Sequence, residues 1–160
     1  MEYTEVMKTV ENLNDIIFCD EDTSEKNVQL FFPLDYQIAH KTLDGTLETV
    51  SAENLPVDGI GVSIGPKTIL HWSTILQEAK TVFFNAAMGF TKRPETLEGL
   101  RGLLHCVAHS NAHTVVGGGD SVAAVERFGL TKKINFLSTG GGATLAYLSG
   151  EQLPGLKALT

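Results

Sequence analysis

The chain has 160 residues, of which 42% are hydrophobic and 19% charged, so its composition excludes a disordered protein and favours a single globular domain over residues 1–160. The formal net charge is −7, no lysine or arginine cluster alternates with aromatic residues, and no apolar run is long enough to cross a bilayer, so we expect neither nucleic acid nor a membrane as a partner. Two cysteines far apart in the sequence, together with a first segment that lacks signal-peptide character, favour a cytoplasmic protein.

The first third of the chain predicts one helix and two short strands. Apolar residues recur at helical spacing over about residues 2–13, which predicts a helix. The apolar run Val28–Phe32 predicts a buried strand that ends at Pro33. Residues 39–58 are polar and predict a surface excursion, after which Ile60–Ile64 predicts a second strand.

The remaining sequence alternates between strand and helix patterns. Thr68 is a candidate N-cap for a helix whose apolar positions extend to Ala79, and Pro94 is a candidate first residue of another helix. Short apolar runs predict three further strands, Thr81–Phe84, Thr114–Val116 and Ile134–Leu137. Short helices are expected after the last two strands, near Ser121–Arg127 and Ala143–Leu148.

Uniformly apolar strands that alternate with helices are typical of a parallel sheet covered on both faces. We therefore expect an α/β fold, in the form of a three-layer, Rossmann-like parallel sheet with helices on both faces. Ligands of such sheets gather outside the carboxyl ends of the strands. The loops Gly65–Pro66, Asn85–Gly89, Gly117–Asp120 and Ser138–Gly142 each follow a predicted strand, so they should share one cleft.

Two glycine triplets are the most informative feature of the chain. Gly117–Gly119 and Gly140–Gly142 each end an apolar run and precede a predicted helix. Successive glycines let backbone N–H groups approach a ligand closely, and a helix N-terminus adds unpaired donors and partial positive charge. Two such corners predict a site for the phosphates of a nucleotide. Because the chain is acidic overall, a magnesium-complexed nucleotide is favoured.

Several segments resemble the phosphoglycerate kinase family, and the last quarter of the chain does so most specifically. Val115–Glu126 resembles the family's GGGD-S/T segment, and Asn135–Ala143 resembles its second glycine-rich segment. Shorter likenesses precede them: Leu30–Asp35 is similar to an LP-x-D strand end, Gly65–Thr68 to a GPKT turn, and Phe84–Gly89 to a WNGPMG loop. The chain as a whole looks like the C-terminal, nucleotide-binding part of that family.

The resemblance implies a phosphotransferase that binds ADP or ATP with Mg²⁺, for reversible phosphate transfer between 1,3-bisphosphoglycerate and ADP in glycolysis. It also implies that two parts of the family's protein have no counterpart here. One is the N-terminal domain that holds 3-phosphoglycerate, which a partner chain would have to supply. The other is the first one or two strands of the nucleotide-binding sheet. We therefore expect the chain alone to be weak or inactive.

The resemblance further implies roles for individual residues. Gly118, Gly119 and Gly141 would face the transferring phosphoryl group, and Asp120 would bind Mg²⁺. Spacing alone leaves Asp120 as either an N-cap or a metal ligand, and Asn85 as either a nucleotide contact or a turn residue. The residues expected to contact the nucleotide are Gly117, Gly118, Gly119, Asp120, Ser121, Ser138, Thr139, Gly140, Gly141, Gly142, Asn85, Gly65, Pro66 and Lys92.

Four positions depart from the family's pattern. Ser63 stands where the family has an aspartate before the GP turn, and Ala86 and Ala87 stand where it has glycine and proline. Lys92 replaces the acidic residue that bonds the ribose hydroxyls. These departures support a second hypothesis, a catalytically degenerate nucleotide-binding or interaction remnant. A third is a folding fragment without activity.

Overall fold

The computed structural model describes residue 29 and residues 31–159. The chain divides into two compact units, Met1–Phe32 and Pro33–Thr160, and we describe the second by itself. The helix predicted over about residues 2–13 lies outside the described residues. The strand predicted over Val28–Phe32 lies partly outside them, and its described residues have no regular secondary structure.

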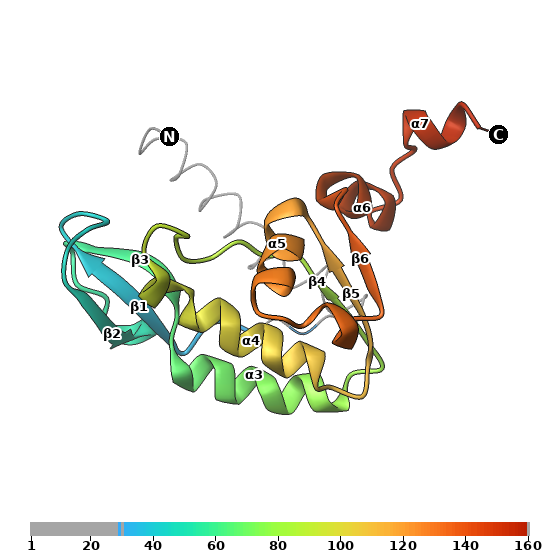
Figure 1. Ribbon diagram of the computed structural model, residues 1–160. Helices are drawn as coiled ribbons and strands as arrows, with labels where there is room; N and C mark the ends of the chain where they lie inside the picture. Colours follow the sequence, from blue (N-terminus) through green and yellow to red (C-terminus); the bar gives the residue numbers. More distant parts are fainter. Residues whose placement is uncertain (1–28, 30, 160) are drawn as a thin grey trace. The chain divides into compact units, whose positions relative to one another are not determined.

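One sheet of the second unit is antiparallel (Figure 1). It contains β1 (Asp35–His40), β2 (Leu47–Ser51) and β3 (Gly59–Ile64) in the order β2-β1-β3, and the short 3-10 helix Ala52–Asn54 precedes β3. Most residues of the surface excursion predicted over residues 39–58 are exposed, as expected, but the end of β1 and all of β2 lie there and were not predicted. Polar residues occupy these strands because one face of an antiparallel sheet can remain exposed to water.

A bulge in β3 connects this sheet to a loop elsewhere in the unit. The register between β1 and β3 shifts between Gln37 and Ile38, which leaves Val62 of β3 without a partner in β1. The Val62 carbonyl oxygen instead accepts a hydrogen bond from the Gly89 N–H at 2.8 Å. This hydrogen bond holds the loop that contains Gly89 against the antiparallel sheet.

Helix α3 (Pro66–Glu78) has its N-terminus filled by a carboxylate of β1. The N-cap is Gly65 rather than Thr68, which lies inside the first turn. Asp35 is 3% exposed and accepts hydrogen bonds from the Lys67 N–H at 3.0 Å, the Thr68 N–H at 2.8 Å and the Thr68 hydroxyl at 2.7 Å. Burial acts to raise the pKa of Asp35, but these hydrogen bonds outweigh it and lower the pKa below the usual carboxyl value.

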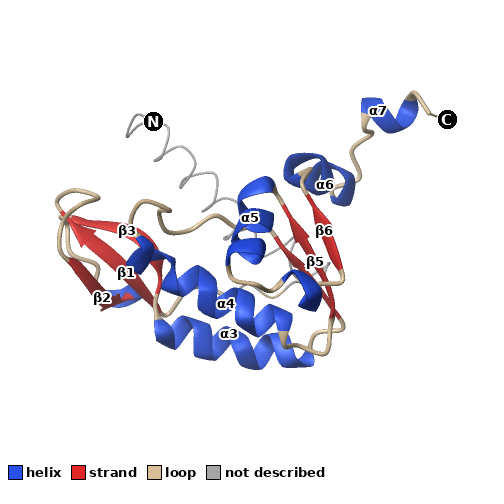
Figure 2. Ribbon diagram, in the orientation of Figure 1, coloured by secondary structure: helices blue, strands red, loops and turns tan. Residues whose placement is uncertain are grey.

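The other sheet is parallel and is flanked by helices (Figure 2). Its strands are β4 (Thr81–Phe84), β5 (His113–Gly117) and β6 (Phe136–Ser138), in the order β4-β5-β6. The α/β class with a parallel sheet and flanking helices is confirmed. The predicted strand Ile60–Ile64 is present as part of β3, but it lies in the antiparallel sheet and not beside β4.

The remaining elements are helices, of which α4 is the longest. They are the 3-10 helix η2 (Pro94–Leu97), α4 (Glu98–Ala108), α5 (Gly119–Arg127), the 3-10 helix η3 (Thr131–Lys133), α6 (Gly141–Leu148) and α7 (Pro154–Lys157). Helix α5 ends at Arg127 and α6 at Leu148, and the glycines two residues further on, Gly129 and Gly150, have φ angles of 70° and 85°, which suit C′ positions.

The main hydrophobic core lies between α4, β5 and α5. Its most buried side chains are Leu104 and Val107 of α4, Val116 of β5 and Val125 of α5, each no more than 1% exposed. Leu100, Leu104 and Val107 recur at helical spacing, so α4 presents one apolar face to the sheet. This core holds β5 and the start of α5 as a rigid frame for the loop between them.

His40, the last residue of β1, bridges two carboxylates of neighbouring segments. Its Nε2 lies 2.8 Å from Glu48 of β2, and its Nδ1 lies 3.4 Å from Asp58, which precedes β3. The hydrogen bond to Glu48, followed by that to Asp58, raises the pKa of His40. Protonated His40 therefore links the two outer strands of the sheet through its charge.

Asp35→Asn should destabilise the protein, because an amide cannot accept the three hydrogen bonds that the carboxylate accepts. We expect a loss of about 2–3 kcal/mol in the free energy of unfolding, measured by urea denaturation at pH 7. The lowered pKa means that the contribution of Asp35 is complete above about pH 3.8 and is lost as the pH falls further. The exposed Asp44→Asn is the control, and equal effects of the two substitutions would contradict this role.

His40→Gln should remove a pH-dependent part of the stability. Because the pKa of folded His40 is raised, its contribution is complete below about pH 6.5 and is lost as the pH rises through the raised value. The difference in Tm between the wild-type chain and the variant should thus shrink from pH 6 to pH 8, in about the range where histidine titrates. A difference that stays constant over this range would show that charge on His40 contributes nothing.

Candidate functional site

The pairing of β5 with β6 brings the two glycine triplets together. Asn135 aligns the strands at their start, because its side-chain oxygen accepts the Thr114 N–H at 2.8 Å while the Thr114 hydroxyl accepts the Asn135 N–H at 3.1 Å. From there the register pairs Gly117 with Ser138 at the carboxyl ends. The Gly118 N–H donates to the Ser138 carbonyl oxygen at 2.8 Å, so the first triplet is bonded to the loop that carries the second.

Three of the six glycines are needed for packing. A Cβ on Gly141 would lie 2.7 Å from the Cα of Gly118, and a Cβ on Gly117 would lie 2.8 Å from the ring of Phe83. Gly118 has a φ angle of 96°, which side chains rarely permit. The two corners therefore touch through backbone atoms: residue 141 has no room for a side chain, and the backbone conformation of residue 118 disfavours one.

The other three glycines leave space beside the helix N-termini. Cβ atoms on Gly119 and Gly142 would meet nothing within 4 Å, and one on Gly140 would make only ordinary contacts. Among the described residues, no side chain accepts a hydrogen bond from the first N–H groups of α5 or α6. In α3 the corresponding donors are occupied by Asp35. The N-termini of α5 and α6 thus keep donors and positive potential available for an anion.

The loop after β4 completes this edge of the site. The side chain of Asn85 lies against both corners, with its oxygen 3.2 Å from the Cβ position of Gly118 and its nitrogen 3.4 Å from that of Gly141. Ser121 is 2% exposed, and its hydroxyl donates to the Ala86 carbonyl at 2.7 Å and accepts the Ala86 N–H at 3.2 Å. Ser121 therefore holds the loop against α5, with its side chain directed into the protein.

A pocket of about 490 Å³ lies beside the first corner, a volume within the range of roughly 300–1,000 Å³ that small-molecule sites occupy. Its wall is mostly apolar, but Lys92, Asp120 and Arg127 also line it. In the described part of the chain, none of these three side chains forms an ion pair or hydrogen bond. The lining residues are Ala87, Met88, Gly89, Phe90, Thr91, Lys92, Leu97, Leu100, Asp120, Ala123, Ala124, Arg127 and Phe128.

Most residues expected at the site are brought together, and two are placed elsewhere. Thr139 is exposed in the second corner, and the Ser138 hydroxyl lies 3.1 Å from that of Thr144 in α6. Gly65 and Pro66 do not line the pocket. They begin α3 against the antiparallel sheet, where Asp35 occupies the space next to Gly65.

Apart from Asp120, the pocket residues that α5 and α4 supply were not predicted from the sequence. Asp120, Ala123, Ala124 and Arg127 have the spacing i, i+3, i+4 and i+7, which places them on one face of a helix. That spacing was the available signal for Arg127. Phe128 and Leu100 carried no such signal, because their apolar side chains are indistinguishable from core residues in a sequence.

Asp120 is the acidic residue best placed to hold a metal ion. It is exposed at the second position of α5 and borders the pocket. In the part of the chain that the structure describes, no group of three or more His, Cys, Asp or Glu side chains could hold an ion alone. One carboxylate suits Mg²⁺, which is commonly bound by one or two carboxylates together with phosphates and water. The arrangement defines an α/β protein with two adjoining glycine corners, each at an uncapped helix N-terminus, beside an apolar pocket.

Comparisons with known proteins place the chain in a family. The model of the family "Phosphoglycerate kinase" matches residues 5–151. A phosphoglycerate kinase of Desulfosudis oleivorans is 40% identical over 137 residues, which are 85% of this chain and 35% of that protein. The chain belongs to the phosphoglycerate kinase family, which is a family of kinases.

Solved structures agree with this assignment. The phosphoglycerate kinase of Coxiella burnetii is similar with a TM-score of 0.76 and 33% identity, over 88% of this chain and 36% of that one. The phosphoglycerate kinase of Pyrococcus horikoshii is similar with a TM-score of 0.77 and 30% identity, over 98% of this chain and 38% of that one. The chain therefore spans just over a third of the length of these relatives. No helix among the described residues is long and apolar enough to span a membrane.

Gly141→Ala and Gly142→Ala should differ sharply in their effect on stability. The added Cβ at residue 141 would press on the Gly118 backbone, and we expect a loss of about 1–3 kcal/mol in the free energy of unfolding. At residue 142 the methyl group has space, and the gain in helix propensity should raise stability by up to about 1 kcal/mol. Urea denaturation of the two variants measures both effects, and equal stabilities would contradict the direct contact of the two corners.

Proposed function

We propose that this chain is the C-terminal, nucleotide-binding part of a phosphoglycerate kinase. It binds ADP or ATP with Mg²⁺ and serves reversible phosphate transfer between 1,3-bisphosphoglycerate and ADP, in cytoplasmic glycolysis. Family membership supports a kinase activity, and the arrangement of the two glycine corners supports the nucleotide side of that reaction.

The observation that carries this proposal is the pair of free helix N-termini joined by the Gly118–Ser138 hydrogen bond. A nucleotide's phosphate chain carries several negative charges close together, so two adjacent groups of N–H donors suit it better than one. Gly119 and Gly142 leave the approach to both groups open. Gly118 and Gly141 would then face the transferring phosphoryl group, positioned by their mutual packing, and Ser138, Thr139 and Gly140 would border the phosphates.

The apolar pocket beside Asp120 would receive the nucleoside. Phe90 and Met88 supply apolar surface there, and Lys92 stands at its rim in the position that carries the family's ribose-binding acid. Asn85 lies between the two corners and would contact the nucleotide where its phosphates meet the loop. In this arrangement the nucleoside binds through burial of apolar surface, and the phosphates bind through backbone donors.

Asp120 would hold the Mg²⁺ ion, which when bound supplies positive charge to the phosphate oxygens. The protein's own residues position the phosphates and exclude water from part of their surface. Gly65 and Pro66 would act only indirectly, through the placement of α3. Because the relatives are almost three times as long, the acceptor substrate would bind to a further domain or chain, and this chain alone should turn over slowly or not at all.

A second candidate function is a nucleotide-binding or interaction remnant that no longer supports catalysis. Two observations favour it. Lys92 and Arg127 place two cations at a rim where the family uses an acid, and the Ser63 hydroxyl is buried with no hydrogen-bond partner among the described residues. Such a remnant would retain the fold while binding ADP poorly.

Calorimetric titration of Mg-ADP into the chain separates these functions. We expect binding to the wild-type chain, a loss of at least about tenfold in affinity for Asp120→Ala, and a similar loss for Gly119→Ala. The second variant is informative because its methyl group fills the approach to the donors yet should leave stability unchanged or higher, since it has space in the fold.

Asp44→Ala, an exposed carboxylate in the β1–β2 turn, serves as the matched control and should bind like the wild type. A folded wild-type chain that does not bind Mg-ADP would favour the remnant. Full kinase activity of the chain alone would contradict the dependence on a further domain.

A further inference from the structure

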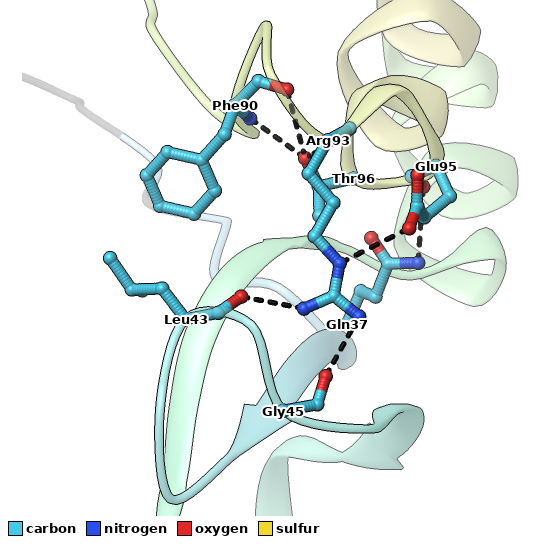
Figure 3. A network of polar contacts seen from close by, with 7 residues as sticks. All are labelled: Gln37, Leu43, Gly45, Phe90, Arg93, Glu95 and Thr96. Carbon is cyan, nitrogen blue, oxygen red and sulfur yellow. Dashed lines mark hydrogen bonds and ion pairs between the residues drawn. The ribbon is translucent and has the colours of Figure 1, made fainter.

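The loop between β4 and η2 is tied to the antiparallel sheet at both ends of its pocket-lining part. At one end the Gly89 N–H donates to the bulge carbonyl of Val62 at 2.8 Å. At the other end lies Arg93, whose guanidinium reaches across to the β1–β2 turn (Figure 3). The three residues between these anchors, Phe90–Lys92, all line the pocket.

Arg93 binds two backbone carbonyls of that turn at once. One terminal nitrogen donates to the Leu43 oxygen at 2.5 Å, and the other donates to the Gly45 oxygen at 2.7 Å (Figure 3). Its Nε pairs with Glu95 at 3.2 Å. The Arg93 side chain is only 19% exposed, so these bonds are partly shielded from water. The planar fork of a guanidinium suits two parallel acceptors, which a lysine ammonium does not match.

The acceptors belong to a turn that is itself well ordered. The Gly45 N–H donates to the Thr42 carbonyl at 2.9 Å, and the His40 N–H donates to the Thr46 carbonyl at 3.0 Å. Lys41 has a φ angle of 62°, and its N–H donates to the Asp58 carbonyl at 2.8 Å. Arg93 therefore connects the loop to a turn that is itself held in place by several backbone hydrogen bonds.

Within the loop itself, Phe90 forms hydrogen bonds with both Thr96 and Arg93. The Phe90 N–H donates to the Thr96 hydroxyl at 2.7 Å (Figure 3). The Arg93 N–H donates to the Phe90 carbonyl at 2.9 Å. Phe90 is 38% exposed, and Thr91 and Lys92 are exposed as well. Because these side chains are not buried in the core, the position of the segment depends on its hydrogen bonds.

We propose that Arg93 is a positioning residue for the nucleoside end of the pocket. By fixing the loop to the Leu43 and Gly45 carbonyls, it holds Phe90–Lys92 at the rim against which the nucleoside binds. The phosphate end is built from β5, β6 and their helices and does not depend on this contact. This inference rests on the proposed nucleotide function, and it assigns to the antiparallel sheet the role of a support for one half of the ligand.

The test compares ADP with pyrophosphate, each with Mg²⁺, on the wild-type chain, Arg93→Gln and Arg93→Lys. Arg93→Gln should weaken ADP binding by about tenfold, as expected for the loss of charge-assisted hydrogen bonds, while pyrophosphate binding should remain within about twofold. Arg93→Lys should show a smaller loss for ADP, since it keeps the charge but cannot bind both carbonyls well. Arg101→Gln, on the exposed side of α4, is the matched control and should change neither affinity.

Hydrogen exchange at the amides of Gly89, Phe90 and Arg93, which donate the hydrogen bonds of this segment, provides a readout that does not require a ligand. Exchange there should accelerate at least about tenfold in Arg93→Gln, with exchange in β5 and α5 unchanged. Unchanged ADP affinity, or an equal loss for ADP and pyrophosphate, would overturn the inference. If the wild-type chain binds no ADP, the proposed function fails, and the exchange experiment alone decides whether Arg93 positions the loop. If Arg93→Gln does not fold, the same comparisons are made with Arg93→Lys.

Discussion

The hydrogen bond from the Gly118 N–H to the Ser138 carbonyl is the contact on which the site depends. It exists because Thr114 and Asn135 align β5 with β6 at the opposite end, and because Gly118 and Gly141 have no side chains to separate the two loops. The glycines thus have two different purposes. Those at residues 118 and 141 allow the two backbone segments to touch, the one at residue 117 makes room for the Phe83 ring, and those at residues 119 and 142 leave space at the surface. A run of three glycines in a sequence does not distinguish these purposes, because only the neighbouring atoms do.

The N-termini of α3, α5 and α6 show two different uses of the unpaired donors and positive potential at the start of a helix. In α3 the positive end of the helix is neutralised by Asp35, which stabilises the junction between β1 and the helix. In α5 and α6 no described side chain takes that place. The protein thus satisfies the N–H donors and positive end of α3 with its own carboxylate and leaves those of α5 and α6 unsatisfied. Leaving them unsatisfied costs some stability, which is typical of sites that bind a ligand.

The sequence was informative where elements follow simple periodicity and less so where tertiary contacts decide. The strands β4 and β5 and the helices after the glycine triplets were predicted closely, because apolar runs and glycines mark their ends. The antiparallel sheet was missed, because β2 is polar and a bulge at Val62 interrupts the alternation expected of a paired strand. The cap of α3 could not be predicted because Asp35 lies more than thirty residues from its partners. The pocket residues on α5 could have been found from spacing, but those on α4 could not.

The partners of Arg93 in the β1–β2 turn are main-chain oxygens, and this has a consequence for how the turn can vary. A carbonyl group is present whatever the side chain, so substitutions at Leu43 or Asp44 leave the acceptors in place. An insertion or deletion would instead shift both oxygens away from the guanidinium of Arg93. A side chain at residue 45 would do the same, because its Cβ would collide with the His40 carbonyl oxygen. This turn should therefore tolerate substitutions at Leu43 and Asp44 but no change in its length, although surface loops ordinarily tolerate both kinds of change.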